Sequence, residues 1–257
     1  METDYINICA AQVERADPDR FMAAMAAPPM ARDVLFPLYA FNVEISRAPW
    51  VTKEPMIAQM RLHYWRDILD EIHNDKAPRP HEVATPLAGL IGPDEAALLD
   101  QLVVARHWDI HSDPFENQDA FDDYIAKTSG NLMLVAARLL GVVDAQTVHD
   151  FAYGVGIANY LRAAPALAAA GRVPLLDGRP EALQELAQGA LDRLQRARKN
   201  RKGIAPNARA ALLSGWQSAA LLKQVVASPQ GVADGALGLS EFSRKMRLMA
   251  VSVTGRW

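Results

Sequence analysis

The chain contains a single cysteine, Cys9, among its 257 residues, which excludes a fold held together by disulfide bonds. It also lacks a long uncharged run. The longest lies between Arg209 and Lys223, well short of the roughly 18–20 residues that a membrane-spanning helix needs. The formal net charge is only −3, so no general attraction to nucleic acid is expected. Half of the residues are hydrophobic, which excludes a disordered chain and supplies a core.

The first twenty residues have neither the apolar stretch of a secretory signal nor the arginine-rich pattern of a transit peptide. A cysteine without a partner in the chain fits a reducing compartment, in which Cys9 is a small buried hydrophobic residue. We therefore expect a cytoplasmic protein.

Alanine is abundant and β-branched runs are few, so almost every segment has the spacing of a helix. Asp17 and Pro18 are typical of a helix start, and Pro37 lies inside a predicted helix that it should kink. Helices are expected over residues 18–28, 30–48, 55–74, 93–110, 119–140, 145–163, 180–201, 206–226 and 240–253, with a short one near 87. Short loops between helices predict an all-α bundle, with one domain spanning residues 1–257.

Six ordered segments in the first two-thirds of the chain carry a resemblance to known proteins. They are DRFMAAMAAPPMARDVLFPLYAFNVEI, MRLHYWRDILDEI, HEVATPL, ARHWDIHSDPF, YIAKTSGNLMLVAARLLGV and YGVGIANYLRAAPALAAAGRVPLL. In this order they resemble the squalene/phytoene synthase family, whose members join two prenyl diphosphates head to head. The resemblance covers residues 17–176, whereas residues 180–257 match only in being helical. It implies a single isoprenoid-synthase-like helical bundle around a central cavity.

The resemblance also implies an aspartate pair on each of two facing helices, which together hold Mg²⁺ and assist the departure of diphosphate. The matching positions are Ser46 and Trp50 in the first helix, and Ala163 and Leu167 in the second. None of these side chains is a carboxylate, and residues 163–171 carry no charge. We therefore expect no catalytic residue, no metal and no cofactor at these positions, and no ordinary prenyl transfer.

Other positions that match the family's cavity remain polar or aromatic, and they are candidates for a pocket that binds an anion or a lipid. They are Tyr39, Asn42, Glu44, Arg61, Trp65, Arg66, Asp109, Tyr124, Asn159 and Arg162. Each could instead belong to the scaffold, with Trp65 in the core and Arg66 paired to Asp70 on the surface. Arg162 lies in an apolar helix, which predicts a buried charge with Glu44 or Asp109 as its partner.

Two basic segments lie outside the resemblance. Residues 193–202 carry six positive charges at the end of a predicted helix, where cations are favourable. They form either a solvated helix end or a patch for anionic lipid head groups or an acidic partner. This run lacks the interleaved aromatic residues of single-strand binders, so no nucleic acid partner is expected. Residues 242–257 form a basic amphipathic segment that could dock on the core or lie at a membrane surface.

A branch of the family that lacks the aspartate pairs is a closer match. The strings AFNVEI and RAAP, and the spacing of Arg61 and Trp65, are similar to that branch, which includes an assembly factor of mitochondrial complex I and related bacterial proteins. The resemblance implies a non-catalytic protein that assists assembly of a respiratory membrane complex. Its partner would be a complex subunit or another assembly factor, and it would lie peripheral to the inner membrane.

Two alternatives to this functional hypothesis stay open. One is an active head-to-head prenyl transferase that uses diphosphate substrates and an atypical Mg²⁺ site. The other is an isoprenoid-binding protein without a protein partner.

Overall fold

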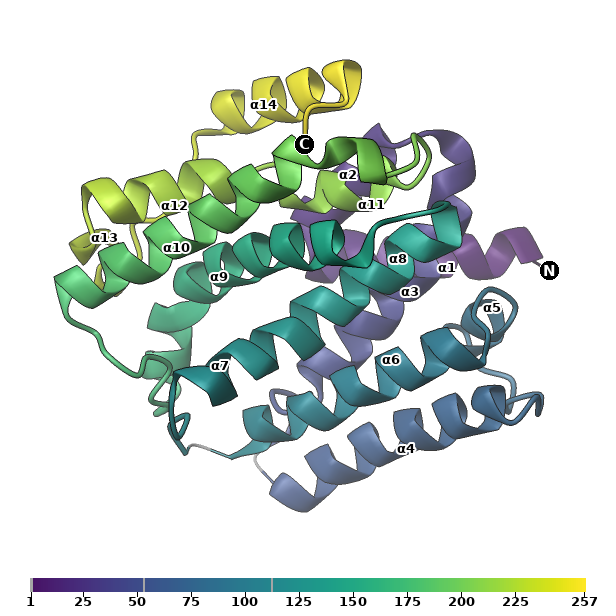
Figure 1. The fold of residues 1–257 in the computed structure, drawn as a ribbon. Coiled ribbons are helices and arrows are strands. Elements are labelled where there is room, and N and C mark those ends of the chain that lie inside the picture. Colours follow the sequence, from purple (N-terminus) through teal and green to yellow (C-terminus); the bar gives the residue numbers. More distant parts are fainter. Residues whose placement is uncertain (1, 53, 112) are drawn as a thin grey trace.

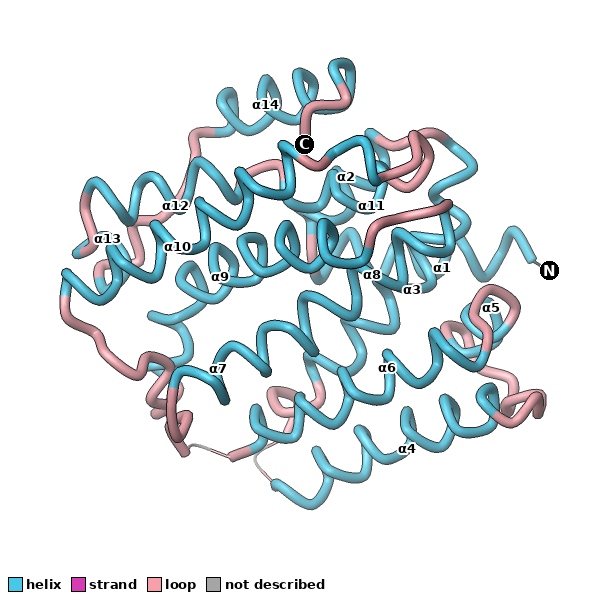
Figure 2. The backbone as a smooth tube through the Cα atoms, in the orientation of Figure 1, coloured by secondary structure: helices cyan, strands magenta, loops and turns pink. Residues whose placement is uncertain are grey.

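The structure is a computed structural model that describes residues 2–52, 54–111 and 113–257. Most residues in these ranges are helical, and the only β-type pairing among them is an isolated bridge between Val143 and Ile204 (Figure 1; Figure 2). The helices of ten or more residues are α1 (Glu2–Ala16), α3 (Pro29–Arg47), α4 (Pro55–His73), α6 (Pro93–Ala105), α8 (Asn131–Leu140), α9 (Ala145–Ala169), α10 (Pro180–Lys199), α12 (Ser218–Ala227) and α14 (Glu241–Thr254). The shorter ones are α2 (Pro18–Ala26), α5 (Ala84–Ala88), α7 (Gln118–Ile125), α11 (Arg209–Leu212) and α13 (Gln230–Ala233). The predicted all-α class is confirmed.

Helix α9 runs through the middle of the bundle. In Figure 1, α4 and α6 form one edge of the molecule, α10, α12 and α14 form the opposite edge, and α8 and α9 lie between them. From Thr147 to Leu161 nearly every residue of α9 is buried, so this helix has no polar face. A helix that is apolar all round belongs in the interior, and α9 therefore connects the two halves of the core. No helix in the described ranges combines the length and the apolar character needed to cross a bilayer.

Prolines mark the beginnings of many helices. Helices α2, α3, α4, α6 and α10 each have proline in their first turn, where the missing amide costs no hydrogen bond. The Asp17 side chain accepts the backbone N–H of Arg20 at 3.0 Å and caps α2. The helix start predicted from Asp17 and Pro18 is therefore confirmed.

Four predicted helix boundaries were wrong, and α1 had not been predicted. The helix expected over residues 119–140 is interrupted by a π-helical turn at Ala126–Gly130, and the last turn expected before residue 110 is a 3₁₀ turn at Arg106–Ile110. Helix α9 continues past residue 163 to Ala169 through Pro165, because a proline removes only one amide from the helix. Residues 206–226 break into α11, a 3₁₀ turn (Leu213–Gly215) and α12.

The break at Leu213–Gly215 has a steric cause. A Cβ at Gly215 would lie 2.5 Å from Val155 and 2.6 Å from Phe151, both on α9. Only a glycine backbone can approach α9 this closely, and the tight turn brings it there.

Helix α9 also meets α10 at a glycine. A Cβ at Gly154 would lie 2.4 Å from Leu194 Cγ and 3.1 Å from the carbonyl oxygen of Ala190. Gly189, on α10, has nothing within 4 Å of its Cβ position and is exposed. The two glycines therefore differ in packing, although both lie inside helices.

Replacing Gly154 by alanine should lower the free energy of unfolding by about 1–3 kcal/mol, because the added methyl group must displace Leu194. The Gly189→Ala variant should raise it by about 1 kcal/mol through helix propensity alone. Urea denaturation followed by circular dichroism measures both. Equal stabilisation by the two substitutions would contradict the close approach of α9 to α10.

Candidate functional site

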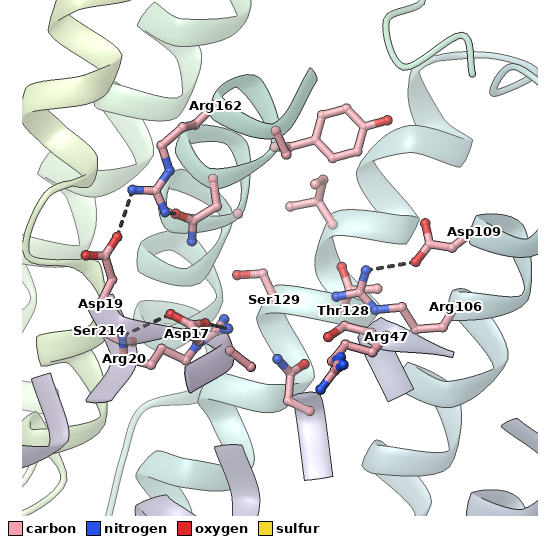
Figure 3. A pocket seen from close by; sticks show the side chains of 18 of the residues that line it. Asp17, Asp19, Arg20, Arg47, Arg106, Asp109, Thr128, Ser129, Arg162 and Ser214 are labelled. Carbon is pink, nitrogen blue, oxygen red and sulfur yellow. Dashed lines mark hydrogen bonds and ion pairs between the residues drawn. The ribbon is translucent and has the colours of Figure 1, made fainter. Parts of the chain in front are cut away.

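A cavity of about 530 Å³ opens beside the central helix, between α2, α3, α9 and the π-helical turn (Figure 3). Its walls come from residues 16–20, the end of α3, the 3₁₀ turn after α6, the second half of α9 and residues 214–218. This volume lies in the range of small-molecule sites. A wider groove of about 1630 Å³ follows α1 and residues 75–93, but none of the predicted site residues lines it. The smaller cavity, called the pocket below, is therefore the candidate site.

The four positions at which the family carries aspartates all line the pocket: Ser46, Trp50, Ala163 and Leu167. Ser46 donates its hydroxyl to the carbonyl of Val43 on its own helix, at 3.2 Å. Trp50 lies at the rim, 49% exposed, and the Arg172 guanidinium lies 4.6 Å from the centroid of its ring. A cation–π contact thus stands beside one of the positions where the family holds a metal ligand.

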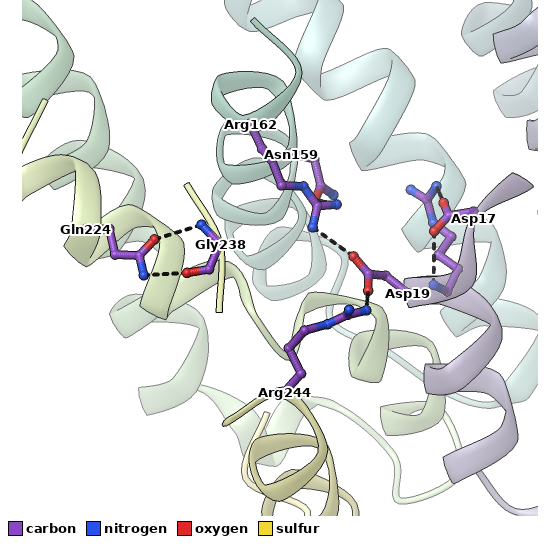
Figure 4. A network of polar contacts seen from close by, with 8 residues as sticks. Asp17, Asp19, Asn159, Arg162, Gln224, Gly238 and Arg244 are labelled. Atoms are coloured by element: carbon purple, nitrogen blue, oxygen red, sulfur yellow. Dashed lines mark hydrogen bonds and ion pairs between the residues drawn. The ribbon is translucent and has the colours of Figure 1, made fainter. Parts of the chain in front are cut away.

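Two aspartates near the start of α2 reach the pocket, and both are paired with arginine. Asp17 accepts the Arg20 guanidinium at 2.7 Å. Asp19 accepts Arg162 of α9 at 2.8 Å and also Arg244 of α14 (Figure 3; Figure 4). Burial alone would raise the pKa of Asp19, but the hydrogen bonds and charges of the two arginines outweigh it and lower that pKa below its ordinary value.

The third aspartate of the pocket belongs to a closed triangle of hydrogen bonds. Arg106 donates to Asp109 at 2.9 Å and to the Tyr124 hydroxyl at 2.8 Å, and that hydroxyl donates to the other oxygen of Asp109 at 2.9 Å. Burial raises the pKa of Tyr124 well above its ordinary value, so the phenol stays protonated. Both oxygens of Asp109 are therefore occupied.

These residues do not fit a magnesium ion. Mg²⁺ is held by carboxylate oxygens, and every carboxylate of the pocket is already paired with an arginine. The lining carries four arginines against three aspartates, so its formal charge would repel a cation. Within the described residues no group of three or more His, Cys, Asp or Glu side chains could hold a metal.

The remaining polar groups of the pocket offer no activated nucleophile. The hydroxyls of Thr128, Ser129 and Ser214 donate to the carbonyls of Tyr124, Ala152 and Ala211 at 2.6, 2.9 and 2.9 Å. No histidine lines the cavity. Asn42 is 5% exposed and its amide oxygen has no hydrogen-bond partner, so it is available to a ligand donor. The pocket can hold a polar or anionic head group, and its serine and threonine hydroxyls named here donate to backbone carbonyls rather than to a general base.

The pocket gathers half of the ten candidate residues predicted from the sequence. Asn42, Asp109, Tyr124, Asn159 and Arg162 line it, whereas Tyr39, Glu44, Arg61, Trp65 and Arg66 do not. Tyr39 and Trp65 are core aromatics, and Trp65 meets Phe41 edge-on with ring centroids 5.1 Å apart. Arg61 is exposed on α4. Arg66 pairs with Asp100 of α6 at 2.7 Å, across two helices, rather than with Asp70 on its own helix.

The partner predicted for Arg162 was wrong. The side chain is 37% exposed rather than buried, and it pairs with Asp19 instead of Glu44 or Asp109. Glu44 contacts Gln12 of α1, and Asp109 is held by Arg106. The reason is the direction in which α9 presents Arg162, toward the start of α2 and away from α6.

Sequence reasoning missed five charged groups of the pocket: Asp17, Asp19, Arg20, Arg47 and Arg106. The charges of Asp17–Arg20 were visible, but Asp17 was interpreted only as part of a helix start. Thr128 and Ser129 were missed because the π-helical turn, which rotates them into the cavity, has no recognisable sequence pattern. Gly156 of α9 faces this turn, since a Cβ there would lie 2.7 Å from Ile125.

Comparisons with known proteins agree on one family. The model of the squalene/phytoene synthase family matches residues 13–175. A Drosophila melanogaster protein, "NADH dehydrogenase (ubiquinone) complex I, assembly factor 6 homolog", is 29% identical over 206 residues, which are 76% of this chain and 60% of the relative. The Bos taurus and Homo sapiens proteins named complex I assembly factor 6 are each 24% identical over 162 residues, 61% of this chain and 48% of theirs. The chain thus spans about half the length of the curated relatives it matches.

A solved structure extends the likeness to the whole fold. The crystal structure of a dehydrosqualene synthase in complex with ligand matches with a TM-score of 0.80, covering 98% of this chain and 97% of that one. The sequence identity is 14%, so the match describes the fold and not the chemistry. The predicted isoprenoid-synthase bundle is confirmed.

Replacing Asp19 by asparagine should lower the free energy of unfolding at neutral pH by about 1–2 kcal/mol, because two arginines lose their shared carboxylate. The folded-state pKa of Asp19 lies below its unfolded value near 3.8. The contribution is therefore present above that value and disappears as the pH falls through the folded-state pKa.

Urea denaturation near neutral pH and at a pH below the folded-state pKa of Asp19 tests this, since the two proteins should differ only under the first condition. The control is Asp234→Asn. Asp234 is exposed and has no ion pair among the described residues, so this substitution should leave the free energy of unfolding unchanged at both pH values. If the Asp19→Asn variant differed from the natural chain by the same free energy of unfolding at both pH values, the ion pairs would contribute nothing.

Proposed function

Because the chain belongs to the squalene/phytoene synthase family, we propose that it is a non-catalytic member that assists the assembly of a respiratory membrane complex, complex I. One observation carries the proposal. The four family aspartate positions, Ser46, Trp50, Ala163 and Leu167, line one pocket, and none supplies a carboxylate.

Prenyl transfer needs this charge arrangement for a physical reason. A departing diphosphate carries several negative charges, and without cations to neutralise them the carbon–oxygen bond does not ionise at a useful rate. Three of the pocket's four arginines do not replace Mg²⁺, because Arg20, Arg106 and Arg162 are each paired with an aspartate of the same pocket. Their charge is therefore already balanced before any ligand enters.

The names of the relatives supply the class of partner. Proteins similar to this chain over 61–76% of its length are named assembly factors of complex I. We therefore take the partner of this chain to be a complex I subunit or another assembly factor. The relatives are longer than the part that matches, so the role of their remaining segments is outside this proposal.

The pocket and one surface segment extend the proposal to lipid. The pocket combines apolar walls such as Ile125 and Leu167 with arginines in its lining, which suits an isoprenoid or a lipid with a polar head group. The basic run 193–202 suits a peripheral contact with an anionic membrane surface. The protein would then work in the cytoplasm, against the inner membrane.

Incubation of the purified protein with farnesyl or geranylgeranyl diphosphate and Mg²⁺ should release no diphosphate above background, because no carboxylate is available to the metal. A dehydrosqualene synthase assayed in parallel is the positive control. Robust release of diphosphate with formation of a squalene- or phytoene-type product would overturn the non-catalytic assignment and support the enzyme with an atypical metal site.

Deletion of the gene in its own host should lower the amount of assembled complex I, and NADH:ubiquinone oxidoreductase activity should fall in proportion. Native gels and activity measurements on isolated membranes check this, with succinate dehydrogenase as the internal control and the intact gene for rescue. Normal complex I in the deletion strain would instead favour an isoprenoid-binding protein without a partner.

A further inference from the structure

Helix α14 leaves an apolar stripe uncovered. Phe242, Met246, Met249 and Val253 follow each other at intervals of four, three and four residues, which puts them on one face of the helix. They are 75%, 46%, 54% and 81% exposed. The stripe, as these four residues are called below, runs about 16 Å along the helix axis. No residue of α14 is fully buried, so the whole helix lies on the surface of the bundle.

The opposite face of α14 fixes the helix to the bundle. Leu248 and Val251 pack against the core, and Arg244 donates to Asp19, the aspartate that also holds Arg162 of the pocket (Figure 4). After the helix ends, Trp257 returns into the protein, where it is 4% exposed and meets Phe151 edge-on with ring centroids 4.9 Å apart. The stripe is therefore held facing outward by contacts on the other side.

Positive charge gathers beside the stripe. Arg198 of α10 donates to the carbonyl oxygen of Trp257 at 2.8 Å, which brings the basic end of α10 against the end of α14. Burial lowers the pKa of Arg198, and the nearby charge of Arg247 lowers it further. In Figure 1 both helices end on the same side of the molecule. Among the described residues, these side chains have no carboxylate within 4 Å: Lys199, Arg201, Lys202, Arg247 and Arg256.

We propose that this face, made of the stripe of α14 and the basic end of α10, binds the surface of an anionic phospholipid bilayer. A helix with an apolar face, placed beside several lysines and arginines, is the pattern of an interfacial helix. Because these cations have no carboxylate within 4 Å in the part of the chain that the structure describes, anionic head groups complement them. The inference rests on the membrane contact of the proposed function and names the surface that makes it.

A second apolar patch supplies a matched control. Met56 and Met60 are 71% and 66% exposed on one face of α4, at the other edge of the molecule (Figure 1). They resemble the stripe in exposure and spacing, but they do not adjoin the basic run. Vesicle binding should therefore depend on the stripe and not on this patch.

The experiment is sedimentation of the full chain with phosphatidylcholine vesicles, with and without added phosphatidylglycerol. The protein should bind only the anionic vesicles, and added salt should weaken binding. The pair Phe242→Asp and Met249→Asp should weaken binding by more than about tenfold. The pair Lys199→Ala and Lys202→Ala should weaken it by about 25-fold. The control pair Met56→Asp and Met60→Asp should leave it unchanged.

All three variants change exposed side chains, and equal thermal unfolding by circular dichroism shows that they fold. The proposal would be overturned if the protein bound neutral and anionic vesicles equally well, or if only the α4 control pair lost binding. So would light scattering that shows a dimer of the natural chain and a monomer of the α14 variant, since a second copy would then cover the stripe. Vesicle binding needs no complex I, so its failure and a failure of the assembly role are separate results.

Discussion

The close approach of α9 to its neighbours determines the architecture of this protein. Because Gly154 has no side chain, α10 can pack closely against α9 at this position, and Gly156 allows the same close packing of the π-helical turn. Gly215 brings the turn before α12 against the same helix. Three segments distant in sequence therefore meet α9 at backbone distance, all between residues 151 and 156. The pocket begins at Gly156 and follows the rest of α9, so these contacts also position the residues of α9 that line it.

The three aspartates of the pocket are all paired with arginines of the same pocket. Where the family places aspartates that bind metal, this chain has a hydroxyl, an indole and two aliphatic side chains. The aspartates that do reach the cavity come from α2 and from the 3₁₀ turn after α6, and each already holds an arginine. An arginine bound to a carboxylate stabilises the fold but has little charge to offer a leaving group.

Asp19 joins the pocket to the outer surface. It accepts one arginine from α9 and one from α14, so the inward face of α14 is fixed to a wall of the pocket. The outward face of α14 carries the four exposed apolar side chains of the stripe. Complex I is a membrane assembly, and a protein that assists it would meet lipid and protein together. Three of the pocket's four arginines are each paired with an aspartate, whereas Lys199, Arg201 and Lys202 after α10 have no carboxylate within 4 Å among the described residues.

The sequence by itself determined the helical class, most helix starts and the identity of the family. These depend on local signals: proline and N-cap residues at helix starts, apolar spacing, and motifs that keep their order. It also determined that no carboxylate stands at Ser46, Trp50, Ala163 or Leu167. Only the tertiary structure decided which charges meet. Arg162 pairs with an aspartate 143 positions away, and no periodicity specifies such a contact, because the rotation of a helix about its axis is fixed by packing.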